Sequence, residues 1–122
     1  EDLDDDPNGA SNHSTTSNTS RYVAPYSGWY LISGVVAFAA NATGLRSTRW
    51  AVNGSVVLNS GVDVTSVTAS TQEVAANTQK VFLTAGDYVE LQAFQSSGGN
   101  LNTVYGSDHN GSRLSVMWVR LA

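Results

Sequence analysis

Cysteine is absent from the sequence of 122 residues, which excludes disulfide frameworks, thiol nucleophiles and iron–sulfur clusters. Charged residues make up 13% of the chain against a usual fraction of roughly 25%, which argues against a long solvated helix or a coiled coil. The longest apolar run, Val35 to Ala40, is far shorter than the ~20 residues of a membrane span. We therefore expect one domain with one core and no membrane insertion.

Positive charge is scarce and scattered. Five of the ten acidic residues stand in the first six positions, whereas residues 21–122 carry six basic against five acidic residues. Lys80 is the only lysine, and the five arginines form no cluster of the kind that neutralises nucleic-acid phosphates. We predict no nucleic-acid binding. Because the chain opens on Glu1, we also expect a processed product or part of a longer protein.

Composition divides the chain into two segments. Residues 1–20 hold an acidic stretch and then a tract of Asn, Ser and Thr, with little apolar surface to bury. We interpret them as an N-terminal tail, or as an edge strand that docks only on an existing sheet. In residues 21–122 valine and threonine are abundant and turn dipeptides recur, which indicates an all-β domain over that range.

The strand pattern begins with a run from Trp29 to Phe38 that is apolar on both alternating faces, which predicts a strand covered on both sides. Asn53-Gly54 lies between the runs 45–52 and 55–58. This dipeptide is the strongest short signal for a β-hairpin, because a type I′ turn needs positive φ at both central residues.

The remaining strands follow from alternation and from turn residues. Residues 79–84 and 87–95 flank Ala85-Gly86, which predicts a second hairpin. The other expected strands are near 62–68, 71–76, 101–105 and 113–121. Roughly eight to ten short strands without a helical pattern predict a two-sheet antiparallel sandwich, of which the jelly roll is the eight-strand form.

Motifs for chemistry are few. Asp4, Asp6 and Asn8 have the spacing of the first half of a calcium loop, but Thr15 stands where a bidentate acid is needed, so a Ca²⁺ site and a solvated acidic turn both remain open. His13 and His109 are read as surface histidines, or as metal or pH-sensing groups across a symmetric assembly. No Gly-x-Ser-x-Gly elbow is present, and we expect neither an enzyme nor another cofactor.

Three segments carry a resemblance to a known family. They are Ala24-Pro25-x-x-Gly28-x-Tyr30, then Asn53-Gly54, then Gly86-Asp87-x-Val89-x-Leu91, in this order. This series resembles the C1q/TNF-like jelly-roll superfamily. The segments Asn41 to Arg46 and Gln95 to Leu101 are most similar to variants in bacterial surface proteins and in tail-fibre or other virion proteins of phages that infect actinobacteria.

The resemblance implies a compact homotrimer, and the sequence supplies a second reason for one. A strand in a sandwich needs one apolar face, whereas 29–38 and 113–121 have two, and the second face needs cover. The residues that we expect at the trimer interface are Trp29, Leu31, Met117, Val119 and Leu121.

The resemblance further implies a non-enzymatic head domain of a phage or bacterial surface fibre that attaches to a host cell or surface ligand, located outside the cell or on the virion surface. The alternative is a structural virion module, for capsid decoration or fibre trimerisation, with only virion or fibre proteins as partners. A secreted carbohydrate-binding or receptor-binding domain outside viruses is a third reading. If attachment occurs, a glycan or protein ligand is expected at exposed polar loops. The loop candidates are Asn100, Asn102, Tyr105, Asp108, His109 and Asn110.

Overall fold

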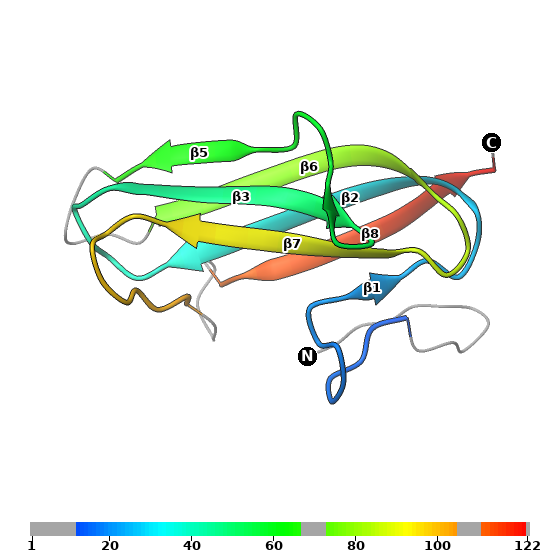
Figure 1. Ribbon diagram of the computed structural model, residues 1–122, viewed down its shortest axis with the longest axis horizontal. Helices are drawn as coiled ribbons and strands as arrows, with labels where there is room; N and C mark the ends of the chain where they lie inside the picture. The colour runs from blue at the N-terminus through cyan, green and yellow to red at the C-terminus, as the bar shows by residue number, and fades with distance from the viewer. Residues whose placement is uncertain (1–11, 67–72, 105–110, 122) are drawn as a thin grey trace.

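Two antiparallel β-sheets form the protein in the computed structural model, which describes residues 12–66, 73–104 and 111–121 (Figure 1). The β3 sheet has the order β1-β7-β3-β4, with β5 also paired to β3; the β2 sheet has the order β6-β2-β8. The bounds in the β3 sheet are β1 (Tyr22–Val23), β3 (Leu45–Val52), β4 (Ser55–Val56), β5 (Val62–Thr65) and β7 (Tyr88–Gln95). Those in the β2 sheet are β2 (Gly28–Phe38), β6 (Glu73–Leu83) and β8 (Arg113–Arg120).

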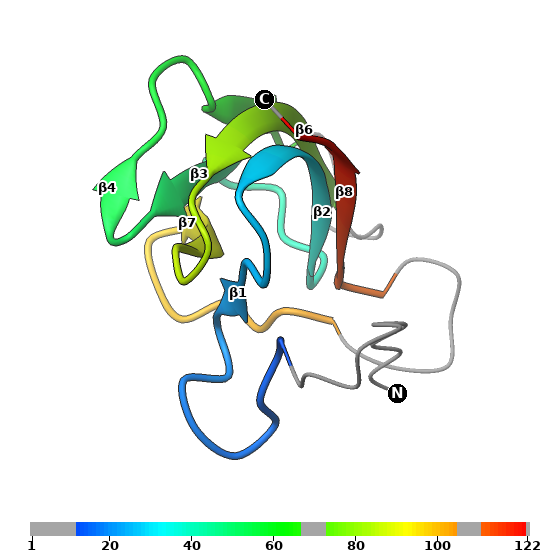
Figure 2. The same ribbon diagram turned by 90° about the vertical axis from the view of Figure 1, so that its right-hand side faces the viewer.

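The described residues contain strands, turns and bridges but no helix, so none of them forms a helix that could cross a membrane. This confirms the prediction of an all-β domain with two antiparallel sheets. The turned view shows the sheets as two layers of a β-sandwich, with β3 and β7 in one layer and β6, β2 and β8 in the other (Figure 2).

The core lies between the two layers and is built from the inward face of each strand. Tyr30 and Ile32 from β2, Trp50 from β3, Leu83 from β6 and Val89 from β7 are all fully buried. Each apolar side chain of this size stabilises the fold by roughly 1.5–3 kcal/mol when it is buried completely. The Tyr30 hydroxyl also donates to the carbonyl oxygen of Tyr26 at 2.7 Å, which satisfies its polar end.

The layers approach closely where β2 carries Gly34. A Cβ atom at this position would collide with the side chain of Leu91 and press on the ring of Trp50. Glycine is therefore required in the middle of the longest apolar run, because a larger residue would separate the two sheets.

Two of the buried polar side chains, Arg46 and Asn77, donate hydrogen bonds to main-chain carbonyl oxygens. The Arg46 guanidinium donates to the carbonyl oxygens of Asn41 at 2.9 Å, Thr43 at 2.9 Å and Leu45 at 3.1 Å, which fixes the loop before β3. Asn77 of β6 donates from Nδ2 to the carbonyl oxygens of Thr48 and Ser60 and so ties the two sheets together. Buried polar groups must be paired in this way to avoid a desolvation cost of roughly 1–3 kcal/mol each.

The hairpin predicted at Asn53-Gly54 is confirmed. Asn53 has φ of 51° and Gly54 has φ of 79°, as a type I′ turn requires, and the turn joins β3 to β4. The second strand is shorter than expected, because pairing stops at Val56 and Leu58 is 85% exposed in the following turn.

The second predicted hairpin is wrong. The turn at Ala85-Gly86 exists, closed by the bond from the Asp87 N–H to the Thr84 carbonyl oxygen at 2.9 Å. However, β6 pairs along its whole length with β2, and β7 pairs with β3 and β1, so the turn passes the chain from one sheet to the other. Alternation in a sequence shows that a segment is a strand, but it does not identify the partner strand.

Two further expectations need correction. Residues 73–76 of one expected strand and 79–83 of another belong to the single continuous strand β6, and β5 ends at Thr65. The segment 101–105 is not a strand among its described residues; it contributes an isolated bridge from Thr103 to Phe38. Residues 67–72 and Tyr105 lie outside the described residues.

Candidate functional site

The outer face of the β2 sheet exposes a cluster of large apolar side chains. Cross-strand pairing sets Phe82 beside Trp29 in one row, and Lys80, Leu31 and Met117 side by side in the next. Leu31 is 39% exposed, Phe82 44% and Met117 58%. We call Trp29, Leu31, Phe82 and Met117 the apolar face. Beyond it the face becomes polar, where the Ser33 and Thr78 hydroxyls lie 3.0 Å apart.

The aromatic pair at one end of this surface is held in a defined geometry. The rings of Trp29 and Phe82 meet edge to face, with centroids 5.6 Å apart and an interplanar angle of 77°. The ammonium group of Lys80 lies 4.6 Å from the centroid of the Trp29 ring. Such contacts favour one arrangement of the side chains, so the surface is ordered before any partner binds.

Strand β8 extends the exposed apolar area beyond the outer face. Its strand contacts are chiefly with β2, and the β3 sheet does not fully cover its inward side. Leu114 and Trp118 point to the inward side of the sheet, because they alternate along β8 with the outer-face residues. They are nevertheless 39% and 44% exposed. The Trp118 ring meets Tyr26 edge to face at 6.4 Å between centroids. The inward side of β8 is thus partly covered at Val116, whereas Leu114 and Trp118 remain open to a partner.

The structure brings together most of the residues proposed for a trimer interface. Trp29, Leu31 and Met117 share the apolar face. Val119 stands at the irregularity where pairing shifts between Trp118 and Arg120, and is 48% exposed. Leu121 follows the strand and is 67% exposed.

Phe82 and Lys80 belong to the same surface, but the sequence analysis missed them. Their only sequence signal is the alternation of β6, in which Val81 and Leu83 are buried and Phe82 is exposed. By itself, that alternation predicts one half of a hairpin with 87–95. Only the pairing of β6 with β2 sets Phe82 and Lys80 next to Trp29 and Leu31.

The loop candidates fall in two groups. Asn100 and Asn102 are exposed in the connection after β7, and the Asn102 carbonyl oxygen accepts a bond from the Ala39 N–H at 2.8 Å. Tyr105, Asp108, His109 and Asn110 lie outside the described residues, as do the calcium candidates Asp4, Asp6 and Asn8. Within the described part of the chain, no three His, Asp or Glu side chains gather as a metal site would require.

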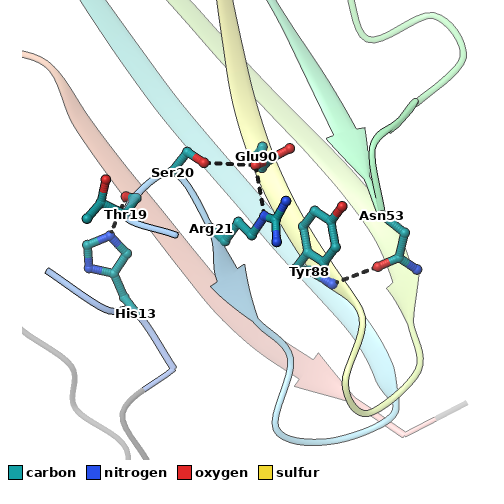
Figure 3. A network of polar contacts seen from close by, with 7 residues as sticks. All are labelled: His13, Thr19, Ser20, Arg21, Asn53, Tyr88 and Glu90. Carbon is teal, nitrogen blue, oxygen red and sulfur yellow. Dashed lines mark hydrogen bonds and ion pairs between the residues drawn. The ribbon is translucent and has the colours of Figure 1, made fainter. Parts of the chain in front are cut away.

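A polar network fastens the segment before β1 to β7 (Figure 3). Glu90 accepts a bond from the Ser20 hydroxyl at 2.8 Å and forms an ion pair with Nε of Arg21 at 3.2 Å. The Arg21 guanidinium also lies 4.1 Å from the Tyr88 ring centroid. His13 donates from its ring to the Thr19 carbonyl oxygen at 2.9 Å. These contacts hold chain segments in place and leave Glu90 occupied by its own neighbours.

A second polar link joins the turns at the same end of the molecule. The Asn53 side chain donates to Asp87 at 2.7 Å and accepts from the Tyr88 N–H at 3.0 Å. The pKa of the Asp87 carboxyl is lowered, first by the bond from Asn53 and second by the bond from the Thr84 N–H. These bonds stabilise the charged Asp87 carboxylate, which links the Asn53 turn to the turn after β6.

Comparison with known proteins shows a similarity to a viral protein. No protein-family model matches the chain. An uncharacterized protein, L688, of Acanthamoeba polyphaga mimivirus is 30% identical over 86 residues, which cover 68% of this chain. The matched region spans 36% of that viral protein, so it corresponds to about a third of the relative's length.

Proposed function

We propose that this chain is a non-enzymatic, trimeric, jelly-roll head domain of a phage or bacterial surface fibre, which attaches to a ligand on a host cell or surface. The proposal places it outside the cell or on the virion surface. The sequence resemblance to C1q/TNF-like domains supports the proposal, and the similarity to a mimivirus protein is compatible with a viral setting.

The observation that carries the proposal is the exposed apolar area of the β2 sheet. Leu31, Phe82 and Met117 on its outer face, and Trp118 on the inward side of β8, are each 39% to 58% exposed in a single chain. Soluble monomers rarely keep contiguous apolar patches of more than a few hundred Å². A neighbouring copy that covered this area would gain roughly 25 cal/mol for each Å² of apolar surface buried.

The position of Lys80 favours a cyclic trimer over a face-to-face dimer. Lys80 is exposed and lies in the row that contains Leu31 and Met117. A twofold axis that passed close to Lys80 would bring it towards its own copy and bury like charges. In a threefold ring each apolar face meets a different surface of the next chain, so Lys80 need not meet itself.

The structural virion module is the second candidate, and the connection after β7 favours it. Gln95 donates from Nε2 to the Gly99 carbonyl oxygen at 2.7 Å, and the Ser97 N–H donates to Gln95 at 2.6 Å. These polar groups bond within their own loop, which reduces what the loop offers to a ligand. A domain of this kind would bind other virion or fibre proteins and no cell-surface ligand.

The oligomeric state is tested by light scattering after size-exclusion chromatography at micromolar concentration. We expect a mass three times that of the 12.9 kDa chain. Met117→Glu should reduce the mass to that of one chain with an unchanged far-UV spectrum, because a charge cannot be buried against apolar neighbours. Leu58→Glu is the matched control, since Leu58 is 85% exposed away from the apolar face, and should leave the mass unchanged. A monomeric wild-type chain would overturn the trimer.

Attachment and a purely structural role are separated by a binding assay with the trimer. Fluorescently labelled protein is mixed with whole actinobacterial cells and, separately, with a glycan array. Saturable binding to either supports attachment. Absence of binding by a protein of confirmed trimer mass supports the structural module instead.

A further inference from the structure

The outer face of the β3 sheet differs in chemistry from that of the β2 sheet. Cross-strand pairing places Asp63 of β5, Ser47 of β3 and Phe94 of β7 in one row, and Arg49 beside Gln92 in the next. Partners in such rows project to the same face, with Cβ atoms roughly 5 Å apart. A single aromatic ring is therefore set among a cation, a carboxylate, an amide and a hydroxyl.

Phe94 is unusually open for an aromatic residue that is paired within a regular sheet, one position before the end of β7. It is 61% exposed, the largest exposed fraction of any aromatic side chain in the described residues. Its cross-strand neighbour is Ser47, not another apolar side chain, so the ring is not part of the apolar face on the other sheet. An exposed ring with polar neighbours offers a flat apolar platform edged with hydrogen-bonding groups.

Arg49 lies on the same face as Phe94, and its Nη donors are not used by other side chains of the described residues. Its Nε donates to the Gln92 side-chain oxygen at 2.8 Å, which fixes the guanidinium plane. Within the described residues no hydrogen bond or ion pair occupies its Nη atoms, and none occupies the Asp63 carboxylate. The surface thus presents a planar pair of donors and, across the sheet, a free acceptor.

Phe94, Ser47, Arg49 and Gln92 line an open hollow of about 640 Å³, and Asp63 stands outside its lining, next to Ser47 on the neighbouring strand. The lining residues of the hollow are Ser47, Thr48, Arg49, Gln92, Ala93 and Phe94. Thr48 faces the core, where its hydroxyl lies 3.5 Å from Asn77 Nδ2, so strand alternation leaves only its main chain for the hollow. The volume is within the range of roughly 300–1,000 Å³ found for small-molecule sites.

The chemistry excludes most ligand classes. A phosphate or nucleic-acid backbone calls for clustered cations, but here Arg49 is one cation with the Asp63 carboxylate nearby. A lipid calls for a continuous apolar surface, which the polar neighbours of Phe94 do not provide. A pyranose sugar fits both features, because one ring face is apolar C–H and its edge carries hydroxyls that both donate and accept.

We propose that the Phe94 hollow on the outer face of the β3 sheet binds a neutral pyranose unit of a surface glycan. The sugar ring stacks on Phe94, and adjacent hydroxyls accept from Arg49 and donate to Asp63. The inference rests on the attachment role proposed above and names its ligand class, but it assigns the contact to strand residues and not to loops. One open site of this kind binds weakly, and a trimer would present it three times.

The test is an NMR titration of labelled protein with methyl glycosides of glucose, galactose, mannose and N-acetylglucosamine, each up to roughly 50 mM because single-site binding is expected to be weak. We expect saturable shifts in the amides of β3 and β7 and in the Arg49 Nε–H for at least one of the four. Glucuronic acid is included as an acidic sugar; if it binds and the neutral sugars do not, the proposal of a neutral pyranose is wrong.

Three variants make the assignment specific. Phe94→Ala should weaken binding by about tenfold or more, because the stacking platform is lost. Arg49→Lys should weaken binding, because a single cation replaces a planar pair of donors. Arg49→Ala should weaken it more, because it removes the donors altogether. Leu58→Ala, another exposed apolar residue, should leave binding unchanged. Unchanged binding in Phe94→Ala would overturn the site, as would the absence of shifts at β3 and β7 with all four neutral sugars.

The design separates this inference from the trimer. Phe94→Ala should keep the trimer mass, since Phe94 lies on the sheet opposite the apolar face. Met117→Glu should keep the shifts at β3 and β7 while it loses the trimer. If the wild-type chain is a trimer but binds none of the sugars, the sugar site is wrong and the trimer stands. If it binds sugar but is a monomer, the trimer is wrong and the sugar site stands.

Discussion

Strands β2 and β8 are neighbours in one sheet and both carry apolar residues on both faces, yet they lie in different environments. In β2, Tyr30 and Ile32 are fully buried beneath the β3 sheet. In β8, their pairing partners Trp118 and Val116 are less buried, because the opposite sheet does not extend over the edge of the sandwich. An apolar strand in the centre forms the core, whereas an apolar strand at the edge forms a surface that calls for a partner.

The largest expected effect compares paired positions in these two strands. Ile32→Ala should lower the free energy of unfolding by about 2–5 kcal/mol, because it leaves a cavity in a packed core. Val116→Ala, opposite Ile32 and only partly buried, should cost about 1 kcal/mol. Urea unfolding of both variants at one protein concentration measures the difference. Equal losses would show that β8 is as enclosed as β2.

A smaller effect is expected from the aromatic contact at the edge. Trp118→Ala removes the edge-to-face contact with Tyr26 and should cost about 1 kcal/mol beyond its lost buried area. In the Met117→Glu variant, proposed to be monomeric, iodide should quench Trp118 and spare the fully buried Trp50. Single-tryptophan variants, with the other tryptophans replaced by Phe, assign the signals. If Trp118 were protected in the monomer, its exposure would not explain an oligomer.

The smallest effect concerns Asp87, which lies away from both contrasted faces and serves as a reference. Its pKa is lowered from an ordinary value of 3.8, chiefly by the bond from Asn53. Because the Asp87 pKa is lower in the folded state, its carboxylate stabilises the fold at pH values above the ordinary pKa of 3.8. This stabilisation is lost as the pH falls from that value through the folded-state pKa.

Asn53→Gly keeps a residue that tolerates positive φ but removes the side-chain amide. The Asp87 pKa should therefore rise towards its ordinary value, and the protein should lose less stability on acidification. Carboxyl-carbon NMR shifts from about pH 6 to about pH 2 measure this pKa. A pKa that is unchanged in the variant would assign the shift to the Thr84 N–H instead.

Local chemistry made part of the fold predictable. The Asn53-Gly54 turn, the long strand from residue 28 to 38 and the final strand all follow from residues close in sequence. The prediction failed at strand pairing, where β6 and β7 join different sheets although a tight turn connects them. Loop length and alternation are the same for a hairpin and for a turn that crosses a sandwich, so the sequence could not distinguish them.

Of the candidate surface, the sequence alone determined that strands 29–38 and 113–121 have a second apolar face, because alternation depends only on the order of residues. It could not place Phe82 and Lys80 beside Trp29 and Leu31, or Asp63 and Phe94 on either side of Ser47. Those neighbours come from strands distant in the chain, and only the packing of the two sheets decides which strands pair and which faces remain in water. The all-β character was therefore set by local residue pattern, and the two surfaces by tertiary structure.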